Sequence, residues 1–94
     1  MNPNKVLYFH SDSCAVAGSV RSKIKELLDS KYPNLDLIEV NTAIQQELAA
    51  SHQIFIVPSI LVFFEGKEYF RFARHFSMSE IDSKIERVYN LLFS

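Results

Sequence analysis

The chain has 94 residues, of which 48% are hydrophobic and 22% are charged, and its formal net charge is −1. This length and this apolar content suffice for one hydrophobic core, so we expect a single domain over residues 1–94. Because the net charge is close to zero, no long-range positive field attracts nucleic acid or an anionic membrane surface, and neither is an expected partner.

Residues 5–31 predict a strand followed by a helix. The segment 5–10 (KVLYFH) is apolar and rich in strand-forming residues, and a cluster of helix-capping residues follows it at 11–13. From Cys14 to about residue 31, apolar residues recur with helical spacing and form one face. They are Val16, Val20, Ile24, Leu27 and Leu28. The sequence Tyr-Pro-Asn at 32–34 should end this helix, because the residue before a proline avoids the helical conformation.

Residues 35–52 predict a second strand and a short helix. The strand is expected at 35–40 (LDLIEV). The connection before it is long enough for a crossover helix, which favours parallel pairing of the first two strands. Thr42 with Gln45 three residues later resembles a capping box, which would open a short helix to about residue 52.

The last third of the chain predicts a hairpin and a helix. Residues 59–64 and 67–73 are expected to form antiparallel strands joined by a tight turn at 65–66. Ser77 and Glu80 form a second capping box, and the helix after it extends to about residue 93. Its apolar face is expected to comprise Ile81, Ile85, Val88 and Leu92. The predicted order is βαβαββα, an α/β fold with one mixed four-stranded sheet and helices on both faces.

This order of elements and two local features resemble the thioredoxin fold. The first feature is Cys14, at the start of the helix that follows the first strand. The second is the segment 56–67 (IVPSILVFFEGK), which is similar to the family's run of apolar residue, cis-proline, threonine, apolar strand and turn glycine. The chain is therefore identified as a minimal, glutaredoxin-sized member of the thioredoxin-like superfamily. The resemblance implies a cis peptide bond before Pro58.

The residues around Cys14 depart from the family's usual pattern. Thioredoxins carry C-x-x-C, whereas this chain reads C-A-V-A, with Ala17 at the position of the second cysteine. Tyr8 falls where thioredoxins place a buried acid that assists resolution. The C-G-F-S motif of monothiol glutaredoxins is not matched either. Because the chain has neither a second cysteine nor clustered histidines, we expect no metal site, no iron–sulfur cluster and no other cofactor.

The position of Cys14 predicts a reactive thiol. A cysteine in the first turn of a helix faces unpaired backbone N–H groups and the positive end of the helix dipole, and both favour the thiolate. We therefore expect its pKa to lie below that of an unperturbed thiol. A thiolate can attack a mixed disulfide, but with Ala17 in place of a second cysteine the release requires an external thiol. The expected function is monothiol thiol–disulfide exchange, with a low-molecular-weight thiol or a protein as partner.

The substrate-binding residues that the resemblance implies are Ser13, Ala17, Val57 and Pro58. A cis-proline would leave the main chain of Val57 free to bind an extended peptide or a small thiol by strand-like hydrogen bonds. The neighbouring side chains of Phe55 and Ile56 would form an apolar rim that suits a protein or thiol partner. Alternatively, Ile56 and Val57 simply begin the core strand, and Pro58 is an ordinary trans proline.

Other interpretations of Cys14 stay open. If it is a small buried side chain, the chain is a redox-inactive binding module that recognises a partner peptide beside Pro58. It would be a redox sensor if oxidation linked it to another molecule. His10 would tune the thiolate if its ring turned toward Cys14, and would otherwise be solvated. His52 and His75 are interpreted as surface residues.

The compartment and assembly follow from the cysteine count and from the apolar runs. One cysteine cannot form an internal disulfide, which fits a reducing compartment. The first residues, MNPNK, lack the apolar core and cleavage site of a secretory signal. The longest apolar run, 54–64, is shorter than the roughly 20 residues that span a membrane. We therefore expect a cytoplasmic monomer or weak dimer.

Overall fold

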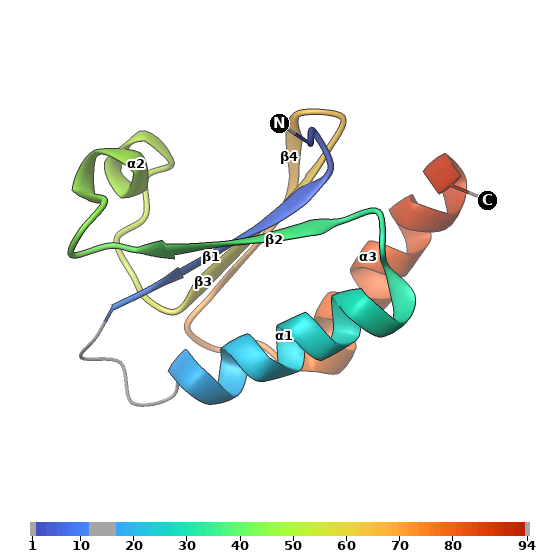
Figure 1. Ribbon diagram of the computed structural model, residues 1–94, viewed down its shortest axis with the longest axis horizontal. Coiled ribbons are helices and arrows are strands. Elements are labelled where there is room, and N and C mark those ends of the chain that lie inside the picture. Colours follow the sequence, from blue (N-terminus) through green and yellow to red (C-terminus); the bar gives the residue numbers. More distant parts are fainter. Residues whose placement is uncertain (1, 12–16, 94) are drawn as a thin grey trace.

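The structure is a computed structural model and describes residues 2–11 and 17–93. Its elements follow the predicted βαβαββα order (Figure 1). They are β1 (Lys5–His10), α1 (Ala17–Lys31), β2 (Asp36–Asn41), α2 (Gln46–Ser51), β3 (Ser59–Phe64), β4 (Lys67–Ala73) and α3 (Met78–Phe93). The helix start predicted at Cys14 lies outside the described residues.

The four strands form one mixed sheet in the order β2-β1-β3-β4. β1 and β2 pair in parallel, which confirms the crossover connection, and β3 is antiparallel to both β1 and β4. All residues of β3 are buried. The central position of β3, between β1 and β4, explains why its sequence is a continuous apolar run rather than an alternating one.

Side chains of β1 alternate between two hydrophobic cores, one on each face of the sheet. Val6 and Tyr8 contribute to the larger core, which contains the buried residues of α1 and α3. Leu7 and Phe9 contribute to the smaller core, which includes Ala49 of α2. Figure 1 accordingly shows α1 and α3 on one side of the sheet, below and to the right of the strands, and α2 on the other, at the upper left. The prediction of helices on both faces is confirmed.

The apolar face of α3 differs from the predicted one at its carboxyl end. Leu92 is 39% exposed, and the buried residue of this turn is Tyr89, which follows Ile81 and Ile85 at a spacing of four. The Tyr89 ring packs edge-on against Tyr32, with 4.9 Å between the centroids. Its hydroxyl accepts hydrogen bonds from the backbone N and the side-chain Nδ2 of Asn34, at 3.2 and 3.0 Å. A partner for its polar tip therefore allows this tyrosine to be buried.

The predicted capping box at Thr42 and Gln45 is wrong. α2 begins at Gln46, and Gln45 occupies the N-cap position without a side-chain capping bond. Asn41 turns the chain instead, because its Oδ1 accepts a hydrogen bond from the backbone N of Ala43 at 2.9 Å. The capping acceptor of the last helix is confirmed, since Ser77 Oγ accepts a hydrogen bond from the backbone N of Glu80 at 3.1 Å.

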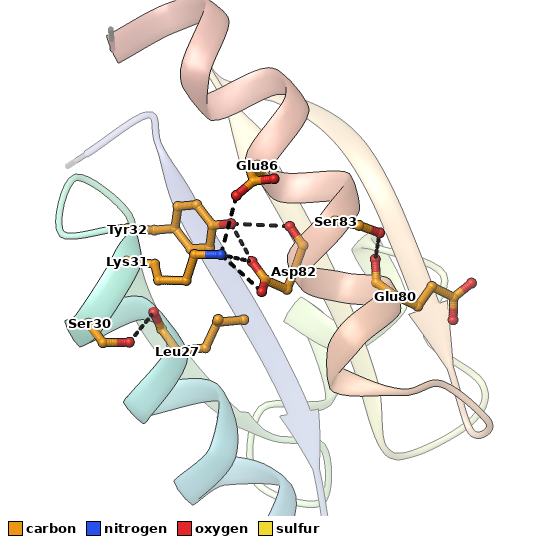
Figure 2. Close-up of polar contacts among 8 residues, drawn as sticks. All are labelled: Leu27, Ser30, Lys31, Tyr32, Glu80, Asp82, Ser83 and Glu86. Atoms are coloured by element: carbon orange, nitrogen blue, oxygen red, sulfur yellow. Dashed lines mark hydrogen bonds and ion pairs between the residues drawn. The ribbon is translucent and has the colours of Figure 1, made fainter.

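The carboxyl end of α1 is tied to α3 by a cluster of charged and phenolic groups (Figure 2). The Tyr32 hydroxyl donates to the Asp82 carboxylate. Lys31 Nζ lies 2.9 Å from Asp82 Oδ1 and 3.3 Å from Glu86 Oε2. Burial, together with the bond to Asp82, raises the pKa of Tyr32. Burial alone would raise the pKa of Asp82, but the hydrogen bonds from Tyr32 and Lys31 outweigh it and lower that pKa, so the carboxylate stays ionised.

Replacing Tyr32 by phenylalanine is expected to destabilise the protein by about 1 kcal/mol, because the charged Asp82 loses a buried donor while the ring packing is kept. Urea unfolding measures this difference. Tyr69→Phe is the matched control, since Tyr69 is 46% exposed and loses only a hydroxyl at the surface. Equal unfolding free energies for the two variants would show that the bond between Tyr32 and Asp82 does not link the helices.

Candidate functional site

The candidate site is centred on the loop that connects α2 to β3, residues 52–58, called here the Pro58 loop. The peptide bond between Val57 and Pro58 is cis. Strand register places Phe9 of β1 opposite Ser59, the residue after Pro58. The loop therefore lies beside the end of β1 that leads toward Cys14. Cys14 and Ser13 are outside the described residues, and Ala17 is the first described residue of α1.

The carbonyl groups of Ile56 and Pro58 are anchored by hydrogen bonds, whereas the main chain of Val57 between them has no partner among the described residues. Ser59 Oγ donates to the carbonyl O of Ile56 at 2.5 Å. The carbonyl O of Pro58 accepts from the backbone N of Arg74 at 2.9 Å. Across residues 2–11 and 17–93, Val57 makes no hydrogen bond through either its N–H or its C=O. As far as the described residues are concerned, its amide and carbonyl are thus available to an incoming extended chain.

The side chains of the loop form an apolar surface next to this free main chain. Phe55 is 87% exposed and Ile56 is 38% exposed. Ile56 does not begin the core strand, which starts at Ser59, and Val57 packs partly against the smaller core. A phenylalanine this exposed loses the free energy of burial unless a partner covers it, so the surface is suited to contact with an apolar group.

The sequence reasoning missed Arg71, a residue of β4 that holds the Pro58 loop. Its Nη2 donates to the carbonyl O of His52 at 2.7 Å, and its Nη1 donates to that of Gln53 at 3.3 Å. The same guanidinium pairs with Glu68, with Nε 2.9 Å from Oε2. This hydrogen bond lowers the pKa of Glu68, and it raises the pKa of Arg71. The pair therefore stays charged at neutral pH.

The aromatic and histidine residues near the site pack against one another. Tyr8, at the position expected for an acid, is buried and stacks on half-buried His10 at 5.4 Å between centroids. His52 is not the surface residue that the sequence suggested: it is half-buried, and its ring lies 5.9 Å from that of Phe9 and 5.7 Å from that of Phe63. Its role in the described residues is therefore packing at the start of the Pro58 loop.

Residues 2–11 and 17–93 contain neither a cluster of metal-binding side chains nor a membrane-spanning helix. No group of three or more histidine, cysteine, aspartate or glutamate side chains in that part of the chain is arranged to hold a metal ion. None of the described helices combines the length and the apolar character needed to cross a membrane.

The sheet order, the arrangement of the helices and the cis-proline before β3 define the thioredoxin fold. No family model matches the chain. The thioredoxin-like protein YdfQ of Bacillus subtilis is 32% identical over 85 residues, which cover 90% of this chain and 75% of that relative. The chain therefore belongs to the thioredoxin-like family. Thiol–disulfide exchange with thiol or protein partners is the chemistry of this family.

Solved structures show the same relationship. Thioredoxin 1 of Thermosipho africanus is 28% identical and superposes with a TM-score of 0.86, covering 96% of this chain and 99% of the other. Thioredoxin O2 of Arabidopsis thaliana, in its oxidised state, has a TM-score of 0.82 at 20% identity, covering 94% of this chain and 76% of the other. At that identity the second likeness concerns the fold alone.

Proposed function

We propose that this protein catalyses thiol–disulfide exchange by a monothiol mechanism, with Cys14 as the nucleophile. The observation that carries the proposal is the main chain of Val57 beside Pro58, which has no partner among the described residues, in a thioredoxin-like chain with one cysteine. Val57 would align an extended substrate by strand-like hydrogen bonds, while Ser13 and Ala17 would flank the sulfur. A chain without an internal disulfide suits a reducing compartment such as the cytoplasm.

The proposed reaction proceeds in two exchanges. The Cys14 thiolate attacks one sulfur of a substrate mixed disulfide, forms a new disulfide with it and releases the other sulfur as a thiolate. An external thiolate then attacks the disulfide at Cys14, takes up the bound sulfur as a new disulfide and restores the Cys14 thiolate. The substrate disulfide is reduced at the expense of the external thiol. Since Ala17 carries no thiol, the second exchange cannot be intramolecular.

Alkylation of Cys14 as a function of pH tests the first exchange. We expect the thiol pKa to lie below the unperturbed value of about 8.5, because a helix amino terminus stabilises the thiolate. The rate of reaction with iodoacetamide from pH 5 to pH 10, followed by mass spectrometry, gives this pKa. A glutathionylated peptide assayed in parallel with glutathione measures turnover. A thiol pKa at or above about 8.5, or no turnover, would contradict the proposal.

A second candidate function is a redox-inactive module that binds a partner peptide beside Pro58. The exposed side chain of Phe55 favours it, because an apolar contact surface needs no reactive sulfur. The two candidates differ in what they require of Cys14, and a single substitution there separates them.

A further inference from the structure

The Pro58 loop is anchored toward both β3 and α2, and the anchors fix different parts of it. Two of them are backbone bonds to α2, since the N–H groups of Gln53 and Ile54 donate to carbonyl groups of that helix, both at 2.9 Å. Toward β3, the bonds to Ile56 and Pro58 described above hold the main chain. Toward α2, Arg71 binds the carbonyl groups of His52 and Gln53. Gln53, just after the C-cap of α2, adopts a positive φ of 57°, a conformation that is uncommon for a residue with a side chain.

Arg71 reaches the loop because β4 carries a bulge. Phe63 pairs with Glu68 and Val62 pairs with Phe70, so Tyr69 is an extra residue in β4. In a regular strand, residues three positions apart point to opposite faces. The extra residue places Glu68 and Arg71 on the same face, where α2 and its loop also lie.

The hydrogen bonds of Arg71 depend on the planar geometry of its guanidinium. Nη2 donates both to the His52 carbonyl, at 2.7 Å, and to Glu68 Oε1, at 3.0 Å, while Nη1 and Nε serve two other acceptors. A lysine ammonium is a compact point charge and cannot form the same set of hydrogen bonds as the planar guanidinium. Glu68 therefore orients Arg71, and Arg71 holds the carbonyl groups that follow α2.

The Pro58 loop has room to move when the hydrogen bonds from Arg71 are lost. A cavity of about 140 Å³ lies between the loop and β4, and its lining includes Phe55, Ile56 and Arg71. Without the guanidinium, the start of the loop is tied to α2 by the backbone bonds of Gln53 and Ile54 alone, and we expect Phe55, which follows them, to shift into this space. The anchors at Ile56 and Pro58 would still hold the cis-proline and Val57 in place.

We propose that Arg71 is a positioning residue that sets the Pro58 loop for polypeptide substrates with apolar residues beside the reactive disulfide. This inference rests on the proposed function and names its substrate class. A small disulfide contacts only the sulfur and the main chain of Val57. A polypeptide also covers two exposed side chains, that of Ile56 and that of Phe55, and Phe55 belongs to the part of the loop that follows the carbonyl groups held by Arg71.

The test compares two substrates in three variants of the full chain. One substrate is a peptide whose glutathionylated cysteine is flanked by phenylalanine, and the other is the mixed disulfide of glutathione and β-mercaptoethanol. For Arg71→Met we expect KM for the peptide to rise about tenfold, the size expected from lost charge-assisted hydrogen bonds, with kcat unchanged. Kinetics on the small disulfide and the alkylation rate of Cys14 should not change.

Two further variants separate positioning from charge. Arg87→Met removes the same charge from an exposed position of α3 that has no ion-pair partner within the described part of the chain, and it should behave as the unsubstituted protein. Arg71→Lys keeps the positive charge but loses the planar guanidinium, so the raised KM for the peptide should persist. Full recovery in Arg71→Lys would overturn the positioning role.

Hydrogen exchange of the amides at 53–57 provides a readout that does not depend on activity. We expect faster exchange there in Arg71→Met, and a smaller increase in Glu68→Gln, which keeps Arg71 but weakens its orientation. Unchanged exchange, or an equal KM change on both substrates, would overturn the inference. If the unsubstituted protein reduces neither substrate, the proposed function and the substrate class fail together, while the exchange data still decide the role of Arg71.

Discussion

Replacing Cys14 by serine is expected to lower the rate of disulfide exchange by at least about a thousandfold, to the level of the uncatalysed reaction. A serine hydroxyl is not ionised at neutral pH and forms no disulfide, so both exchanges of the proposed cycle stop. The measurement is the reduction of a glutathionylated peptide by glutathione, followed by mass spectrometry. Serine is close to cysteine in size, so the fold and the Pro58 loop should be preserved.

A double variant controls for the mere presence of an exposed thiol. Cys14→Ser combined with Ser83→Cys places the only cysteine in the middle of α3, where backbone N–H groups are already paired within the helix. We expect it to remain inactive. If Cys14→Ser alone keeps its cellular function and its partner, the binding module is correct and the exchange mechanism is not.

The sheet could be predicted from the sequence because its signals are local. Successive side chains of a strand point to opposite faces of the sheet. In β1 this places Val6 and Tyr8 in one core, and Leu7 and Phe9 are in the other. The continuous apolar run of β3 identifies a central strand before any pairing is known. The two turn residues at 65–66 then indicate that β3 and β4 form a hairpin. Gly66 adopts a φ of 83°, a conformation that glycine favours.

The errors at the helix ends arose where two local signals competed. Thr42 and Gln45 have the spacing of a capping box, but Asn41 lies one residue earlier and its short side chain closes the turn first. In α3, Leu92 has the spacing of a core residue, yet Tyr89 is buried because Asn34 satisfies its hydroxyl. Only the folded chain shows which of the competing residues finds a partner.

The part of the site formed by Pro58 could be found in the sequence, and the part formed by Arg71 could not. Pro58 belongs to a recognisable run of residues, whereas Arg71 is one arginine in a strand and resembles a solvent-exposed residue. Its contact with His52 joins residues 19 positions apart and depends on the bulge in β4. A bulge has no reliable sequence signal here, since Tyr69 is an ordinary strand residue.

Replacing Ala17 by cysteine is expected to remove the requirement for an external thiol. Position 17 follows Cys14 by three residues, which is the spacing of the two cysteines in the C-x-x-C motif of thioredoxins. The added thiol would attack the mixed disulfide at Cys14 from within the same molecule, at an effective concentration far above that of a cellular thiol. The variant should therefore release the bound glutathione and form an internal disulfide in a single turnover without added glutathione.

Mass spectrometry of a quenched single turnover distinguishes the two mechanisms. The unsubstituted protein should release the peptide thiol and accumulate as its mixed disulfide with glutathione, and Ala17→Cys should accumulate as its own internal disulfide. Ala15→Cys adds the same thiol at the neighbouring position, where the spacing is wrong, and should remain trapped like the unsubstituted protein. If Ala17→Cys stays trapped as well, position 17 does not face the sulfur of Cys14, and Ala17 does not belong to the site.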